Sequence, residues 1–156
     1  MKILAIEDND DKFNRVAELT TIACPSSSLA RACDLFEAER MIEEPGWDLL
    51  LLDMTLDLKR GGAIRPSSAQ DYTGGMKIIG QMYWDELVVP TIIITAFDSF
   101  PASREDGNGA VIGLEAVEGE ARDKLGDLLI GTVRHGPDGW EEELLALLDR
   151  AKGRSE

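Results

Sequence analysis

The sequence predicts an α/β protein in which helices cover both faces of one five-stranded parallel sheet. Five short apolar runs alternate along the chain with segments whose apolar residues recur at helical spacing. The runs at 49–52 and 92–94 contain no polar residue, which is typical of strands that are covered on both faces. Right-handed crossovers between such strands place helices on both sides of the sheet. We therefore expect residues 1–156 to form a single domain.

In the first half of the chain, residues 2–6, 29–33 and 49–52 are predicted to be strands. The helix after the first run has Phe13, Val16, Ala17 and Thr20 at helical spacing and is broken by the Pro-Ser stretch from position 25. The next helix has an apolar face of Leu35, Ala38, Met41 and Ile42, and Asp34 precedes it as a predicted N-cap.

In the second half, helices are predicted over 75–86 and 114–125, and strands over 88–94 and 128–133. Asp138 and Glu141 form a D-x-x-E capping box before a last helix, which turns Trp140, Leu144, Leu145, Leu147 and Leu148 inward. Two stretches, about 56–74 and 97–113, show neither the helical nor the strand spacing of apolar residues and are predicted to be extended loops.

Composition excludes several classes of function. The net charge of −14, from 30 acidic and 16 basic residues, disfavours passive binding to nucleic acid or anionic lipid. No apolar run is long enough to span a bilayer, and acidic residues follow the first strand too soon for a signal peptide. Cys24 and Cys33 show no zinc-binding spacing. We expect reduced thiols and a cytoplasmic location.

The chemically informative residues lie where strands end. Glu7 and Asp8 follow the first strand, Asp53 follows the third and Thr95 ends the fourth. Taken singly, such acids are more readily explained as solvated strand ends or helix caps than as reactive groups. Carboxyl ends of neighbouring parallel strands share one edge of a sheet, where α/β folds bind ligands. Acids gathered there repel one another unless a cation neutralises them, and Mg²⁺ is the natural partner.

These residues resemble a known family. The pair Glu7-Asp8, Asp53 in "WDLLLLDM", Thr95-Ala96 after "PTIII" and the last helix are similar to the receiver domains of bacterial two-component response regulators. The similarity spans nearly the whole chain. It implies a flavodoxin-like three-layer sandwich with strand order 2-1-3-4-5.

The resemblance also implies roles for individual residues. Asp53 would be the phosphoacceptor, and Thr95 the hydroxyl that follows the phosphoryl group. Mg²⁺ would be held by Glu7, Asp8, Asp53 and the backbone carbonyl of Thr55. The donor would be a histidine kinase or phosphotransfer protein. The output would be another protein, and a homodimer is a further expectation. No enzymatic activity beyond self-phosphorylation and dephosphorylation is expected.

The chain departs from the family pattern at the fifth strand. The family has a lysine at the end of this strand, but no lysine lies between Lys124 and Lys152. Arg134 or His135 stands in its place, and the sequence leaves the choice open. The aromatic residue expected three positions earlier falls on Gly131 or Thr132 and is absent. Trp140 does not replace it, because its place at the start of a helix favours a core role.

These departures support a second interpretation, a pseudo-receiver that binds proteins without phosphotransfer. A phosphatase with an aspartyl nucleophile is disfavoured, because Asp53-Met54-Thr55 lacks the D-x-D spacing and Asp57 comes too late. The basic residues Lys59, Arg60 and Arg65 in the first predicted loop either dock an acidic partner or fold back onto the acidic site.

Overall fold

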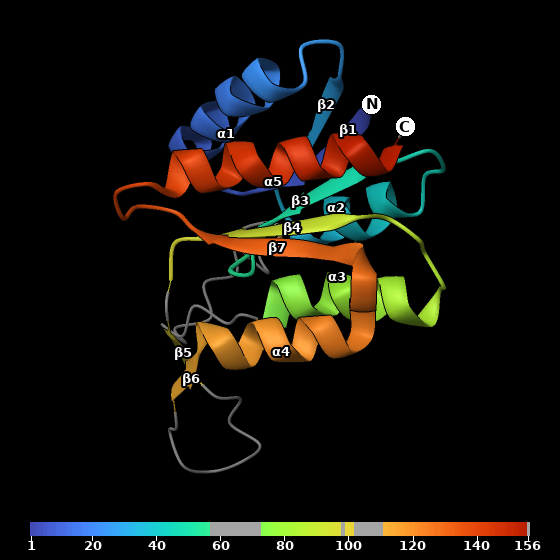
Figure 1. The fold of residues 1–156 in the computed structure, drawn as a ribbon. Coiled ribbons are helices and arrows are strands. Elements are labelled where there is room, and N and C mark those ends of the chain that lie inside the picture. The colour runs from blue at the N-terminus through green and yellow to red at the C-terminus, as the bar shows by residue number, and fades with distance from the viewer. Residues whose placement is uncertain (57–72, 98, 102–110, 156) are drawn as a thin grey trace.

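The computed structural model describes residues 1–56, 73–97, 99–101 and 111–155, and its main feature is a five-stranded parallel sheet. The strand order is β2-β1-β3-β4-β7, so the predicted order 2-1-3-4-5 is confirmed, with β7 as the fifth strand (Figure 1). The strands of this sheet are β1 (Lys2–Ile6), β2 (Ser28–Ala32), β3 (Leu49–Leu52), β4 (Thr91–Thr95) and β7 (Leu129–Arg134).

Helices cover both faces of the sheet, as predicted. Helices α1 and α5 pack on one face, and α2, α3 and α4 pack on the other (Figure 1). The helices are α1 (Asp10–Ala23), α2 (Leu35–Ile42), α3 (Thr73–Trp84), α4 (Leu114–Leu125) and α5 (Trp140–Ser155), and a 3-10 turn η2 (Gly126–Leu128) precedes β7.

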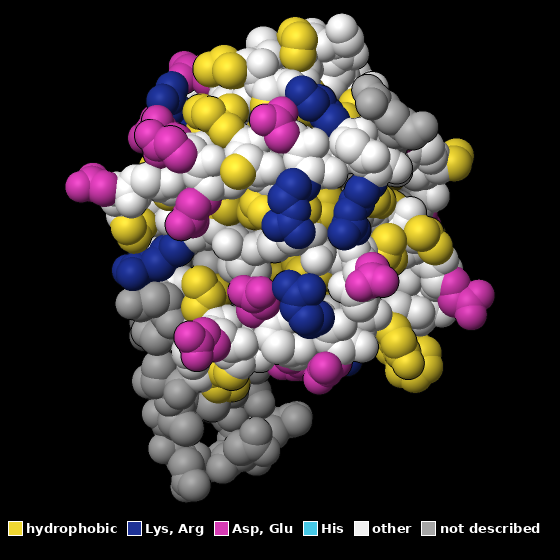
Figure 2. Space-filling view, viewed as in Figure 1, with side chains coloured by type: hydrophobic (Ala, Val, Ile, Leu, Met, Phe, Trp, Pro, Cys, Tyr) yellow, Lys and Arg dark blue, Asp and Glu magenta, His cyan; other side chains and the backbone are white. Residues whose placement is uncertain are grey.

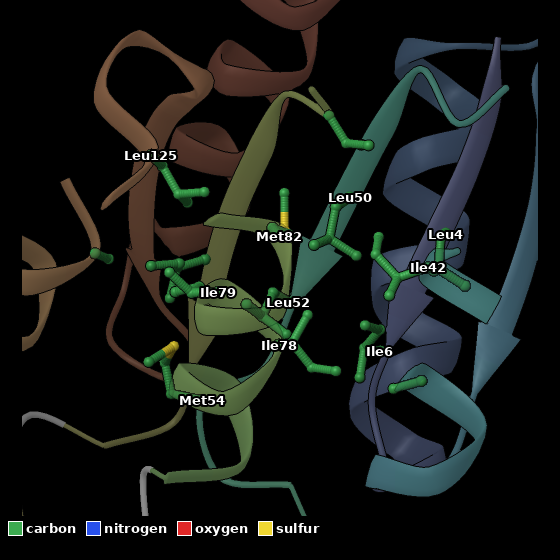
Figure 3. Packing of buried hydrophobic residues seen from close by; sticks show 14 of the residues in the cluster. Leu4, Ile6, Ile42, Leu50, Leu52, Met54, Ile78, Ile79, Met82 and Leu125 are labelled. Atoms are coloured by element: carbon green, nitrogen blue, oxygen red, sulfur yellow. The ribbon is translucent and has the colours of Figure 1, made fainter. Parts of the chain in front are cut away.

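The leucine run of β3 supplies both cores, because successive side chains of a strand point to opposite faces. Leu50 and Leu52 join the cluster beneath α2, α3 and α4, which Figure 3 shows around Ile78, Ile79 and Met82. Leu49 and Leu51 join the cluster beneath α1 and α5. All four leucines are buried, which explains why the run shows no polar alternation.

The second predicted loop, 97–113, is not irregular throughout. Its ends form an antiparallel pair, β5 (Ser99–Pro101) with β6 (Val111–Gly113), which lies beside the start of α4 (Figure 1). Strands this short carry too little alternation to be recognised from sequence. Most of the first predicted loop, including its three basic residues, lies outside the described residues.

One predicted helix cap is confirmed and one is wrong. The Asp34 side chain accepts a hydrogen bond of 2.7 Å from the Glu37 N–H at the start of α2. The capping box of Asp138 and Glu141 does not form, because α5 begins at Trp140 and Asp138 lies one residue too early to cap it. The Glu141 carboxylate instead accepts two hydrogen bonds of 2.7 Å from Arg15 of α1. A charged, bidentate partner outcompetes a backbone amide.

The surface carries both signs of charge. Figure 2 shows acidic and basic side chains interspersed over the face formed by α5, β7 and α4. Within the part of the chain that the structure describes, no helix combines the length and the apolar character needed to cross a membrane. Cys24 is buried, Cys33 is exposed, and both are free thiols.

Candidate functional site

The carboxyl edge of the sheet contains a cavity of about 370 Å³. Strands β1 and β3 are neighbours, and the Asp53 N–H donates to the carbonyl of Ile6 at 3.0 Å, so the two strand ends stay in register. Residues from β1, α1, β3, β4 and β7 or their connections meet there. The cavity is lined by Glu7, Asp8, Asn9, Lys12, Asp53, Thr55, Ala96, Phe97 and His135.

Three carboxylates predicted from the sequence come together in this cavity. Glu7, Asp8 and Asp53 each offer an oxygen, and these oxygens lie within 4.8 Å of one another. Glu7 and Asp53 are buried, whereas Asp8 is exposed. Hard oxygen donors at this separation, with one of them open to solvent, are the ligands that Mg²⁺ prefers. The residues present therefore fit this ion.

Glu7 is held by its own loop. Its Oε1 accepts a hydrogen bond from the Asn9 N–H at 3.0 Å, and its Oε2 lies 2.6 Å from the Lys12 ammonium. Burial, and then the charge of Asp53, raise the pKa of Glu7 to about 7, although Lys12 opposes the rise. This carboxyl therefore exchanges its proton near neutral pH, in a cavity open to ligands.

Both oxygens of Asp53 also have partners. Oδ1 accepts hydrogen bonds of 3.2 Å from the N–H and the hydroxyl of Thr55, in a turn that directly follows β3. Oδ2 lies 3.1 Å from the Lys12 ammonium. The side chain is only 4% exposed, so these partners fix its orientation toward the cavity.

Lys12 is the member of the site that sequence reasoning missed. Its side chain is 5% exposed, and its ammonium bridges Glu7 and Asp53. A signal for it existed: Lys12 lies four positions before Val16, on the stripe of α1 that is buried against the sheet. A lysine on a buried stripe needs an anionic partner, and the strand-end acids supply it.

A second cation steadies the acidic connection between β1 and α1. Arg31 of β2 donates from Nε to the carbonyl of Glu7 at 2.9 Å and pairs with the Asp10 carboxylate at 2.8 Å. The Asn9 side chain caps α1 by accepting from the Lys12 N–H at 2.9 Å. These bonds fix the first turn of α1, and so they direct the Lys12 side chain into the cavity.

At the end of β7, the two candidates for the family lysine differ in place. His135 lines the cavity, whereas Arg134 is exposed and pairs in register with Thr95. The His135 ring packs edge-on against Trp140, with ring centroids 4.5 Å apart. Burial and the nearby Lys12 lower the pKa of His135, against smaller opposing effects of Asp53 and Glu141.

Thr95 ends β4 at the same edge but is fully buried. Its hydroxyl accepts a hydrogen bond of 3.4 Å from the Phe97 N–H, and its carbonyl accepts one of 2.8 Å from the His135 N–H. Ala96 and Phe97, rather than Thr95, line the cavity. The predicted switch hydroxyl is thus tied to the segment that leaves the site.

Comparison with known proteins places this geometry in a recognised fold. No protein-family profile matches the sequence. No curated protein matches it either. Solved structures do match, with low sequence identity. The receiver domain of the Francisella response regulator 1452 is 17% identical with a TM-score of 0.59, and the match covers 99% of this chain and 98% of that one.

Two further structures agree. The N-terminal domain of a response regulator/sensory box/GGDEF 3-domain protein from Carboxydothermus hydrogenoformans is 16% identical, with a TM-score of 0.60 and complete coverage of both chains (100% each). The signal receiver domain of an HD domain-containing protein from Pseudomonas fluorescens Pf-5 is 16% identical, with a TM-score of 0.62, covering 99% of this chain and 98% of that one. The resemblance predicted from the strand-end motifs is therefore confirmed for the fold: this chain folds as a response-regulator receiver domain does.

Proposed function

We propose that this protein is a receiver domain that accepts a phosphoryl group on Asp53 with Mg²⁺ and passes the signal to a partner protein. The observation that carries the proposal is the convergence of the Glu7, Asp8 and Asp53 carboxylates on one cavity at the carboxyl edge of the sheet. Fold alone does not assign function, whereas a set of groups suited to one chemistry does.

The reaction would be transfer from a phosphohistidine of a histidine kinase or phosphotransfer protein. A carboxylate oxygen of Asp53 attacks the phosphorus, and an O–P bond forms as the N–P bond breaks. The electron pair of the N–P bond returns to the histidine nitrogen, and the product is an aspartyl phosphate. The cavity admits the donor because it is open beside the exposed Asp8.

Glu7, Asp8, Asp53 and the backbone carbonyl of Thr55 would hold the ion. When bound, Mg²⁺ supplies positive charge that offsets the negative oxygens of the phosphoryl group. The protein contributes the placement of these ligands, since Glu7 and Asp53 are already held by the N–H groups of Asn9 and Thr55.

The response would start at Thr95. Its hydroxyl accepts from the Phe97 N–H, so a move of the hydroxyl toward the cavity to donate its proton to a phosphoryl oxygen would be transmitted to Phe97. Phe97 begins the segment that enters the β5–β6 pair and then α4. His135, which lines the same cavity and is bonded to the Thr95 carbonyl, would sense the new charge as well. An output partner would bind the surface altered in this way.

The experiment is phosphorylation with acetyl phosphate and Mg²⁺, followed by intact-protein mass spectrometry. We expect a phosphoryl adduct on the wild type that hydroxylamine removes, as it does acyl phosphates. Asp53→Asn should carry no adduct. Asp11→Asn is the matched control, because Asp11 is an exposed acid in the first turn of α1 that does not line the cavity. An unmodified wild type, or an adduct that persists in Asp53→Asn, would contradict the proposal.

The second candidate function is a pseudo-receiver that binds proteins without phosphotransfer. One observation favours it: Lys12 already pairs with both buried carboxylates, so the site is compensated without an added ion. The same mass measurement separates the two functions, because a pseudo-receiver gains no adduct at any acetyl phosphate concentration.

A further inference from the structure

Lys12 occupies an unusual position for a lysine, inside a cavity and at the centre of the acidic cluster. Its ammonium lies 2.6 Å from Glu7 Oε2 and 3.1 Å from Asp53 Oδ2. The side chain is as buried as the carboxylates it contacts. It comes from α1, whereas the family pattern described above takes its lysine from the end of the fifth strand.

Burying an ammonium is unfavourable unless anions compensate for the lost water. Here the two partners are the groups that the proposed reaction uses, and not a separate structural pair. A structural counter-ion to Glu7 alone would need no contact with Asp53, yet the ammonium is within hydrogen-bonding distance of both. Thr55 donates to both oxygens of Asp53, and the Lys12 ammonium adds a charged partner to Oδ2.

The end of β7 does not supply an equivalent charge. His135 lines the cavity, but burial and Lys12 itself disfavour its charged form. Arg134, one residue earlier, is exposed and does not line the cavity. Among the described residues that line the cavity, Lys12 is the only lysine or arginine.

We propose that Lys12 is the positioning cation of the Asp53 site: it orients the acceptor carboxylate and contacts an oxygen of the phosphoryl group once Asp53 carries it. This inference rests on the proposed function. The ammonium is a compact charge on a flexible stem, so it can shift from Asp53 Oδ2 to a phosphoryl oxygen while its pairing with Glu7 persists.

The position of Lys12 has a second consequence, which makes the inference testable. Its positive charge lies among the carboxylates that would bind Mg²⁺, so it opposes the ion by repulsion and by competition for the same oxygens. Removing the charge should therefore weaken binding of a phosphoryl mimic and strengthen binding of Mg²⁺. A merely structural role would weaken both, because both need the same arrangement of carboxylates.

The test compares wild type with Lys12→Met, which keeps an unbranched side chain of similar length without the charge. Mg²⁺ affinity is measured by tryptophan fluorescence, and the beryllofluoride adduct, a mimic of the phosphoryl group, by ¹⁹F NMR at saturating Mg²⁺. We expect adduct affinity to fall about tenfold or more, the loss of one charge-assisted hydrogen bond. We expect Mg²⁺ affinity to rise severalfold.

Lys77→Met is the matched control, because Lys77 is an exposed lysine of α3 that does not line the cavity, and it should change neither affinity. If Lys12→Met does not fold, Glu7→Gln and the double variant Lys12→Met/Glu7→Gln give the same comparison without an unpaired Glu7 carboxylate. Equal adduct affinity with and without Lys12, or a fall in both affinities, would overturn the inference. A wild type that forms no adduct would instead overturn the proposed function, and the role of Lys12 with it.

Discussion

Gly75, near the start of α3, lies directly against the backbone of Met54, the residue that follows Asp53. The Gly75 N–H donates to the Met54 carbonyl at 3.1 Å. A Cβ at position 75 would lie 2.6 Å from the Met54 Cα and 3.0 Å from the Asp53 carbonyl oxygen. Backbone atoms cannot rotate out of such a contact, so α3 fixes the position of the segment that carries the Asp53 carboxylate.

Gly75→Ala should therefore destabilise the protein and displace Asp53. We expect a loss of about 1–3 kcal/mol in the free energy of unfolding, the usual cost of overpacking. Urea denaturation measures it. Gly80→Ala is the matched control in the same helix, because a Cβ at Gly80 meets nothing within 4 Å. It should stabilise by up to about 1 kcal/mol through helix propensity. Equal effects of the two substitutions would contradict the packing argument.

The only histidine of the sequence reports on the charges in the cavity. Burial and Lys12 lower the pKa of His135 below its usual 6.5, and Asp53 acts in the opposite direction. A ¹H NMR titration of this single imidazole should therefore give a midpoint below 6.5. Lys12→Met should raise the midpoint, and Asp53→Asn should lower it. A titration midpoint that neither substitution changes would show that His135 lies away from these charges.

Glu7 should make the stability of the metal-free protein fall as pH rises. Its pKa is about 7 in the folded protein and about 4.5 when unfolded, so the folded state holds a proton that the unfolded state has released between these values. The contribution is complete below about pH 4.5 and is lost as pH rises through about 7. Urea denaturation in EDTA at several pH values should show this decline.

Glu7→Gln removes the titration, so its unfolding free energy should decline less between pH 4.5 and 7 than that of wild type. The comparison between variants is needed because His135, whose pKa is lowered, contributes with the opposite sign: its contribution is present above pH 6.5 and is lost at lower pH. Parallel pH profiles for the two proteins would contradict the raised pKa of Glu7.

Gly131 and Leu147 should be energetically coupled. A Cβ at Gly131 in β7 would lie 2.8 Å from Leu147 Cδ2 of α5, so any side chain there must move that leucine. Gly131→Ala should therefore be more favourable in a Leu147→Ala background than in wild type, by about 0.5–3 kcal/mol. A double-mutant cycle from urea denaturation measures this difference, and strict additivity would show that the contact is relieved without cost.

This contact also explains the missing aromatic residue of the fifth strand. Leu147 fills the space that a large side chain at position 131 would need. The neighbouring Thr132 is half-buried, with its hydroxyl oxygen enclosed. The absence of an aromatic side chain at position 131 thus coincides with a close contact between β7 and α5.

The sheet and the acidic cluster could be predicted because both follow from local patterns. An unbroken apolar run such as Leu49–Leu52 indicates a doubly covered strand, and residues that follow neighbouring strands meet at one edge. Glu7, Asp8 and Asp53 therefore identified the site before their distances were known.

The features that sequence reasoning missed depend on contacts between distant segments. The position of Lys12 on the buried stripe of α1 indicates that it needs an anionic partner, but only the fold shows that Asp53 is one of them. The partner that Glu141 finds in Arg15 is 126 positions away in sequence, so the capping box was the natural local interpretation. The choice between Arg134 and His135 likewise depends on how the strand ends, which no residue pattern encodes.

Two acids of this site, Glu7 and Asp8, lie in the same short segment as the Lys12 ammonium. The positive charge beside Asp53 therefore comes from the segment that carries Glu7 and Asp8, whereas the described residues that line the cavity from the end of β7 include no lysine or arginine. Searches that recognise such sites by a lysine at the end of the fifth strand will overlook proteins whose lysine comes from α1. Transplanting residues 7–12 into a related scaffold would carry Lys12 along with Glu7 and Asp8.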